Sequence, residues 1–180
     1  MIILGVDPGS INCGYGVIKI IKKDFVLIEY GVIRAKKQFD DLHLRLREIY
    51  LRLHEVIKRS KAEEAAFETM YYAKNVQSLI KLTHARSAAI LSAVMNDLPI
   101  AEYSPTEVKK SVTGRGGAAK EQVQFMVMNM LKIKETPELF DATDALAVAI
   151  CHALKRDLPA TGSKNWADYI KKNPDKIIKV

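Results

Sequence analysis

The sequence predicts an α/β domain, and three observations support this prediction. The first 33 residues contain three β-rich runs joined by short turns, which is typical of an antiparallel meander. After residue 40, segments with helical periodicity alternate with short apolar runs of strand length. The length of 180 residues suits one domain whose core is large enough to fold without disulfides. We therefore expect three strands followed by an α-β-α-β succession and further helices.

The strands of the meander are expected at residues 2–6, 14–21 and 25–33. The first is a continuous apolar run, and Pro8 and Gly9 end it because both residues favour a turn. Asp7 is therefore expected at the end of a strand. The three residues at 22–24 between the second and third strands favour a hairpin.

Four helices and two more strands are expected after the meander. Apolar residues recur at helical spacing over about 41–59, 75–97 and 123–131, and a last helix runs from Pro137 or Asp141 to about Leu154. Short apolar runs predict strands at 65–68 and 99–103. The composition becomes polar and basic after Arg156. We expect one domain over residues 1–156 and a C-terminal tail over 157–180.

Composition narrows the class of function. The chain has 28 Lys and Arg against 21 Asp and Glu, and the resulting charge of +7 favours a polyanionic partner. Two cysteines are too few for a disulfide framework or a cysteine-based zinc site. Nothing in the sequence resembles a secretion signal or a membrane span, so we expect no membrane partner and a cytoplasmic location.

Four acidic residues lie where apolar elements begin or end: Asp7, Glu68, Asp141 and Asp144. Asp141 and Asp144 are three residues apart, so a helix places both on one face. Carboxylates at strand ends also meet if their strands are adjacent. Grouped carboxylates repel one another unless a cation neutralises them, and oxygen ligands suit Mg²⁺ or Mn²⁺. Two such ions form a centre that can cleave phosphodiesters.

Each acid also has a structural interpretation. Asp141 or Thr136 can cap the last helix, and the helix dipole favours an acid there. Asp7 stands before a Pro-Gly turn in a common turn composition, and Glu68 can simply be solvated at a strand end.

Two other classes of function are relevant to this sequence. The turn after Asp7, followed by Gly14-Tyr15-Gly16, is compatible with a phosphate-binding turn of actin-like or sugar-kinase folds. The chain is short for two lobes, and it lacks the Gly-Lys-Ser/Thr of a P-loop. A DNA-binding module without catalysis would have lost one or more of the four carboxylates, and all are present.

The motifs together resemble the RuvC family of Holliday-junction resolvases. The opening segments that carry this resemblance are Gly5-Val6-Asp7-Pro8-Gly9-Ser10 and Gly14-Tyr15-Gly16-Val17-Ile18. Later motifs follow in the family's order: Phe67-Glu68 with Tyr72-Ala73-Lys74-Asn75, Val108-Lys109-Lys110, Gly114 with Lys120 and Gln122-Val123-Gln124, and Asp141-Ala142-Thr143-Asp144-Ala145-Leu146-Ala147. The resemblance spans residues 1–154, and the tail carries no motif of the family.

The resemblance implies an RNase H-like fold, with a five-stranded mixed sheet flanked by helices. It also implies a homodimeric endonuclease that depends on Mg²⁺ and resolves four-way DNA junctions in recombination and repair. We expect two Mg²⁺ ions per active site, with Mn²⁺ as a substitute. The expected partners are junction DNA, a second copy of the chain, and the RuvA–RuvB branch-migration complex.

The same resemblance assigns roles to individual residues. The catalytic, metal-holding carboxylates would be Asp7, Glu68, Asp141 and Asp144, the functional lysines Lys109 and Lys120, and the DNA-contacting aromatic residue Tyr71. We expect Lys120 to approach the scissile phosphate, Lys109 to hold the DNA backbone, and Tyr71 to stack on a base at the crossover. The alternative interpretations are that both lysines are simply solvated and that the tyrosine packs on the edge of the sheet.

The helix expected at 75–97 carries more apolar surface than one core-facing stripe needs. We expect part of it to contact the second subunit. The alternative is that one subunit buries all of it.

Overall fold

A five-stranded mixed sheet forms the centre of the computed structural model, which describes residues 1–22, 24–69, 75–134 and 140–156. The strands are β1 (Ile2–Asp7), β2 (Cys13–Ile21), β3 (Asp24–Ile33), β4 (Glu64–Glu68) and β5 (Ile100–Tyr103), in the spatial order β3-β2-β1-β4-β5. The first three pair antiparallel, whereas β4 lies parallel to β1 and to β5. The expected meander and the mixed sheet are confirmed.

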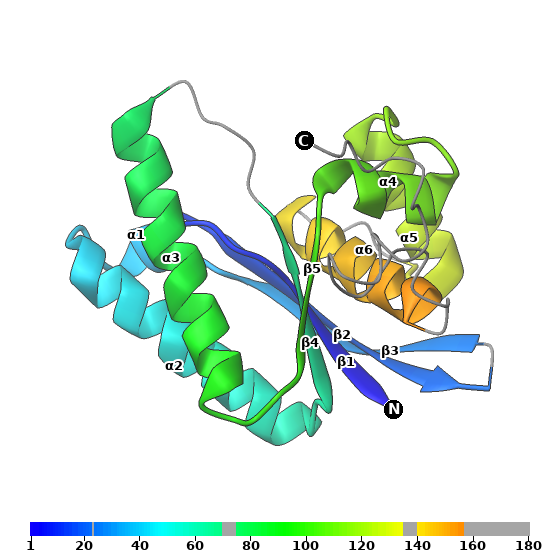
Figure 1. The fold of residues 1–180 in the computed structure, drawn as a ribbon, viewed down its shortest axis with the longest axis horizontal. Helices are drawn as coiled ribbons and strands as arrows, with labels where there is room; N and C mark the ends of the chain where they lie inside the picture. Colours follow the sequence, from blue (N-terminus) through cyan, green and yellow to red (C-terminus); the bar gives the residue numbers. More distant parts are fainter. Residues whose placement is uncertain (23, 70–74, 135–139, 157–180) are drawn as a thin grey trace, which may run out of the picture.

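Helices cover both faces of this sheet (Figure 1). One face packs against α1 (Ala35–Gln38), α2 (Leu42–Ser60) and α3 (Val76–Val94), and the other against α4 (Pro105–Thr113), α5 (Lys120–Leu131) and α6 (Phe140–Lys155). Successive side chains of a strand point to opposite faces, so Leu4 and Val6 pack in the first core and Ile3 in the second. Asp7 follows the odd-numbered residues of β1 and therefore belongs to the face of α4, α5 and α6.

Polar caps explain where several helices begin. The side chain of Asp41 accepts a hydrogen bond from the Leu44 N–H at 3.1 Å at the start of α2, and Asn75 does the same for α3. The expected boundaries of α2, α3, α5 and the C-terminal end of α6 agree with the structure to within three residues. Helices α1 and α4 were not expected.

Helix α4 escaped prediction because it is short. It has nine residues, of which Val108 and Val112 are buried, and two apolar positions are too few to define a helical period. A local signal was present nonetheless: Ser104 and Glu107 form a reciprocal capping box around Pro105, the first helical residue.

Helix α6 lies directly on the backbone of β1 and β2. A Cβ atom on Gly5 would collide with the carbonyl oxygen of Ala145, and one on Gly14 with the carbonyl oxygen of Asp141. The absence of these two side chains permits the close approach. Because Gly14 pairs with Asp7, the first turn of α6 lies beside the end of β1.

Some expectations fall outside the described residues. These are the tail at 157–180, Tyr71, Thr136 and a helix start at Pro137, so the division of the chain at residue 156 stays a prediction. Both cysteines are buried and free. Among the described helices, none has the length and apolar character of a membrane span.

Candidate active site

Three of the predicted carboxylates and both predicted lysines line one cavity of about 320 Å³: Asp7, Glu68, Asp144, Lys109 and Lys120. The fold explains this grouping. Asp7 and Glu68 end parallel neighbouring strands, and the pairing of Val6 with Phe67 puts the two carboxyls side by side. Asp144 reaches them from α6. The expectation that strand-end acids meet is thus confirmed for this set.

Burial and mutual repulsion make these carboxyls hard to ionise. Burial is the largest cause and the neighbouring carboxylates the next, and together they raise the pKa of Asp7 to about 7 and that of Glu68 to about 8. The pKa of Asp144 is also raised, again mainly by burial. A hydrogen bond between the Asp7 and Glu68 carboxyls lowers the pKa of Asp7 and raises that of Glu68.

Lys120 supplies positive charge at the rim of the cavity. It is the first residue of α5, where the Gln122 side chain accepts a hydrogen bond from the Ala119 N–H at 3.1 Å and fixes the helical turn. Its Nζ lies 3.2 Å from Asp144 Oδ2 and 5.9 Å from the centre of the Phe140 ring. The charge of Lys109 also lowers the pKa of Asp144. Both lysines therefore act on the carboxylates electrostatically.

Asp141 occupies a different place. It is partly buried in the first turn of α6 and does not line the cavity, although its charge raises the pKa of Asp7. It follows Phe140 inside the helix, so it does not stand before the helix as a capping residue would. Tyr71 lies outside the described residues, and the structure does not place it.

The donor set suits a hard divalent cation. Aspartate and glutamate oxygens are the ligands that Mg²⁺ and Mn²⁺ prefer, and three such groups face one cavity. Among the described residues, no three His, Cys, Asp or Glu side chains are grouped so that they could hold a metal ion as they stand. Asp144 instead pairs with the Lys120 ammonium. A cation there would share the carboxylates with this lysine.

Sequence reasoning missed the apolar wall of the cavity, which Pro105, Val108 and Val123 form. The wall brings α4 and α5 together with the strand ends. Val123 begins the apolar periodicity at 123–131, and Val108 lies on α4, which is too short for its period to be recognised. The Ser104-Pro105 start of α4 is the signal that could have revealed it.

Sequence comparison identifies close relatives. The family described as "Crossover junction endodeoxyribonuclease RuvC" matches residues 3–152. The RuvC protein of Cytophaga hutchinsonii is 43% identical over 176 residues, which cover 98% of this chain and 88% of the relative. That of Aeromonas salmonicida is 48% identical over 151 residues, which cover 84% and 86% of the two chains.

Solved structures agree. Thermus thermophilus RuvC superimposes with a TM-score of 0.78 at 31% identity, covering 87% of this chain and 95% of that one. The T. thermophilus protein in complex with a Holliday junction substrate gives a TM-score of 0.77 at 29% identity, covering 87% and 94%. The yeast mitochondrial resolvase Ydc2, at 11% identity and a TM-score of 0.61, covering 84% and 78%, shares the fold. The RNase H-like fold is confirmed, and the chain belongs to the RuvC family of crossover junction endodeoxyribonucleases.

Proposed function

We propose that this Holliday junction resolvase hydrolyses DNA at the cavity of Asp7, Glu68 and Asp144, with two Mg²⁺ ions, or Mn²⁺ in their place, held by these carboxylates. The observation that carries the proposal is the raised pKa of Asp7 and Glu68 beside two lysines in one cavity. Acids that repel one another cost folding energy, and a divalent cation offsets that cost. Asp7 would be the shared ligand because it ends β1, the middle strand of the sheet.

Divalent cations in such a site stabilise the charge on the scissile phosphate and favour ionisation of the attacking water. Side chains of the protein would bind and position the DNA. Lys120, whose Nζ already contacts Asp144, can turn to a phosphate oxygen that enters the cavity. Lys109, which also lines the cavity, can hold the DNA backbone. Asp141, one helical turn before Asp144, does not line the cavity, but it would add negative charge near it and serve as a further metal ligand.

The exposed apolar side chains of α3 support the proposed homodimer. Val76, Ile80, Leu91 and Val94 are each at least 43% exposed, while the buried residues of this helix are small ones such as Ala85. A two-fold dimer would present two equal active sites to two strands of one junction. In this scheme Tyr71 stacks on a base at the crossover, and the RuvA–RuvB complex is a partner in the cytoplasm.

Substitution of Asp7 by Asn tests the proposed site. With a labelled four-way junction, we expect Asp7→Asn to bind as the wild type does without metal but to lose Mg²⁺-dependent cleavage. Asp40→Asn, an exposed aspartate between α1 and α2, is the control and should cut normally. Cleavage by Asp7→Asn at a rate near that of the wild type would remove Asp7 from the site.

A further inference from the structure

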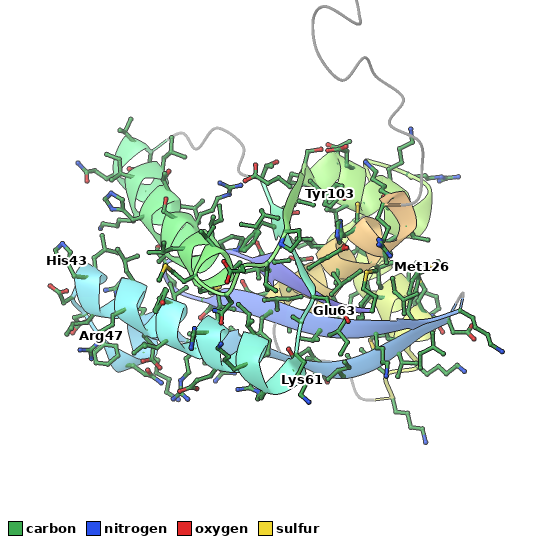
Figure 2. The ribbon with its side chains drawn as sticks, turned by 60° about the horizontal axis from the view of Figure 1, so that its bottom comes forward. His43, Arg47, Lys61, Glu63, Tyr103 and Met126 are labelled. Carbon is green, nitrogen blue, oxygen red and sulfur yellow. The ribbon has the colours of Figure 1, made fainter. Side chains whose placement is uncertain are left out.

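The end of β4, which carries Glu68, is held differently on its two sides. On the side of β5, the Thr69 N–H donates a hydrogen bond to the carbonyl oxygen of Tyr103 at 2.8 Å (Figure 2). On the side of β1, the chain continues from Asp7 to Pro8, and a proline has no N–H to donate to β4. A donor from outside the sheet can therefore strengthen this strand end.

Arg86 of α3 supplies such a donor. Its Nε donates a hydrogen bond to the Glu68 carbonyl oxygen at 3.5 Å, and its Nη2 lies 2.7 Å from Oε1 of Glu102. Glu102 precedes Tyr103 on β5, and Tyr103 is the residue that pairs with Glu68. One guanidinium group thus joins α3 to the ends of two neighbouring strands.

The surroundings of Arg86 fix the direction of its donors. Its side chain is 18% exposed, whereas Lys81 on the same helix is exposed. Ala89 and Ala93, which are buried, follow Arg86 at a spacing that places all three on one face of α3. A cation that is largely buried is tolerated when it is paired, and Glu102 supplies the pairing charge. Because a guanidinium is planar and rigid, the ion pair at Nη2 also orients Nε.

Arg86 reaches Glu68 from the face of the sheet opposite to the candidate active site. Phe67 packs in the core under α2 and α3, so the next side chain, that of Glu68, points to the other face, where it lines the active-site cavity. Helix α3 covers the face of Phe67 (Figure 1). Arg86 therefore holds the main chain of Glu68, while the carboxyl group of Glu68 faces the cavity.

The position of that main chain matters for a metal ligand. Mg²⁺ requires oxygen ligands at about 2.0–2.1 Å in nearly octahedral geometry, so a small displacement of one carboxylate weakens the site. Groups that hold a ligand in place without contacting the metal typically contribute about ten- to a hundredfold to metal affinity or activity.

We propose that Arg86 is a positioning residue for the metal site, and that its Nε contact with the Glu68 carbonyl oxygen holds the Glu68 carboxylate where it binds the cation. This inference rests on the proposed function, because it takes Glu68 as a metal ligand. It extends that function to a residue on the opposite face of the sheet and makes α3 part of the support of the site.

The test measures Mg²⁺ binding by the full chain without DNA. Thermal melts over a range of Mg²⁺ concentrations give an apparent dissociation constant for each variant. Arg86→Met removes both contacts of the guanidinium. Arg86→Lys retains a charge for Glu102, but a lysine has one terminal nitrogen and lacks the separately directed Nε–H. We expect both variants to bind Mg²⁺ about tenfold more weakly than wild type, and to need correspondingly more Mg²⁺ for half-maximal cleavage of a four-way junction.

Lys81→Met is the matched control, because Lys81 is an exposed cation on the same helix. Its Mg²⁺ dissociation constant should equal that of the wild type. Arg86 variants that melt at a lower temperature without metal but bind Mg²⁺ as the wild type does would show that Arg86 only stabilises the fold, and would overturn the proposal. Weak Mg²⁺ binding by Arg86→Met with normal binding by Arg86→Lys would also overturn it, since the ion pair with Glu102 would then suffice. Arg86→Lys keeps the test valid if Arg86→Met does not fold.

Glu68→Gln separates this inference from the proposed function. Mg²⁺ binding and cleavage by Glu68→Gln at wild-type levels would remove Glu68 from the metal site, and both proposals would fail. Loss of both in Glu68→Gln, together with normal Mg²⁺ binding in the two Arg86 variants, would overturn the role of Arg86 alone.

Discussion

Strand β4 carries a glutamate at each end, and the two have opposite surroundings. Glu64, at the start, lies 2.7 Å from His152 Nε2 and 3.5 Å from an Nη2 of Arg156. Glu68, at the end, faces Asp7 and Asp144, and its pKa rises to about 8. Both side chains point to the same face of the sheet, four residues apart. A buried carboxylate that contacts cations or hydrogen-bond donors stabilises the fold. A buried carboxylate that contacts other carboxylates has a charge that a ligand can neutralise.

Helix α6 spans both surroundings. Its second turn brings Asp144 to the candidate active site, and its last turns bring His152 to Glu64. His152 also makes a 2.8 Å hydrogen bond with the hydroxyl of Tyr103, which Figure 2 shows on β5. A neutral imidazole satisfies both neighbours if Nε2 donates to Glu64 and Nδ1 accepts from the tyrosine. His152 thus joins α6 to β4 and β5 at the Glu64 end of β4, which we call the paired end.

Replacing each glutamate by glutamine tests this comparison most directly. Glu68→Gln should lower junction cleavage by more than about a hundredfold, because it removes a proposed ligand. Glu64→Gln should retain cleavage but lower the free energy of unfolding by about 1 kcal/mol, because the amide still accepts from His152 but no longer neutralises Arg156. Cleavage assays and urea unfolding give the two values. Equal loss of cleavage in both variants would show that the two ends do not have separate roles.

The charge on Lys120 should have the next largest effect. Lys120→Ala should slow cleavage by about ten- to a hundredfold, the loss typical of a residue that supports a metal site. Single-turnover rates at saturating protein separate this effect from binding. Lys110→Ala is the control, because Lys110 is exposed on α4 and does not line the active-site cavity. An unchanged rate for Lys120→Ala would place this lysine outside the reaction.

Stability should depend on pH in the way that raised carboxyl pKa values require. The pKa of Asp7 is about 7 and that of Glu68 about 8 in the folded chain, against 3.8 and 4.5 as ordinary values. The folded chain therefore binds more protons than the unfolded chain above about pH 4, so its stability falls as the pH rises toward 8. In EDTA we expect the free energy of unfolding of wild type to fall over this range and that of Asp7→Asn to fall less. Wild type and Asp7→Asn with the same pH profile would contradict the raised pKa of Asp7.

Divalent cations should restore part of the stability that the chain loses as the pH rises, and this effect should be smaller than the loss itself. At pH 8, Mg²⁺ at ten times its dissociation constant should stabilise wild type by about 1.4 kcal/mol, and Asp7→Asn by much less. Thermal melts with and without Mg²⁺ measure the difference. Glu64→Gln should respond as the wild type does, because its substitution lies at the paired end of β4. A variant-independent response would mean that the cation binds elsewhere.

Periodicity and motif order predicted most of the fold and most of the charged residues that line the candidate active-site cavity. The strands and long helices followed from apolar spacing, and the grouping of Asp7, Glu68 and Asp144 from their places at element ends. The difference between Asp141 and Asp144 could not be predicted, because a spacing of three puts both on one face without fixing which one reaches the cavity. That depends on the rotation of α6 against the sheet.

Long-range partners were also beyond prediction. Glu64 and His152 are 88 residues apart, and neither belongs to a motif that would pair them. A cavity between α1, α2, β2 and β3 combines cations from a loop and two helices, with pairing acids from β3 and α2. On the sequence these charges look like ordinary solvated residues, and only the packing of α2 on β2 and β3 brings them around one space.

The two glycines under α6 have a consequence for ion choice. Gly5 and Gly14 let the helix lie on the sheet, so the distance between the backbone that carries Asp144 and the backbone that carries Asp7 is set by a contact between main chains. Oxygen ligands stand at about 2.0–2.1 Å from Mg²⁺ and at about 2.3–2.6 Å from Ca²⁺. A Cβ atom at Gly14 would lie 1.9 Å from the Asp141 carbonyl oxygen, so a side chain there would push α6 away from the sheet. If the proposed cations bind between these carboxylates, backbone packing as well as carboxylate chemistry would set the size of cation that fits.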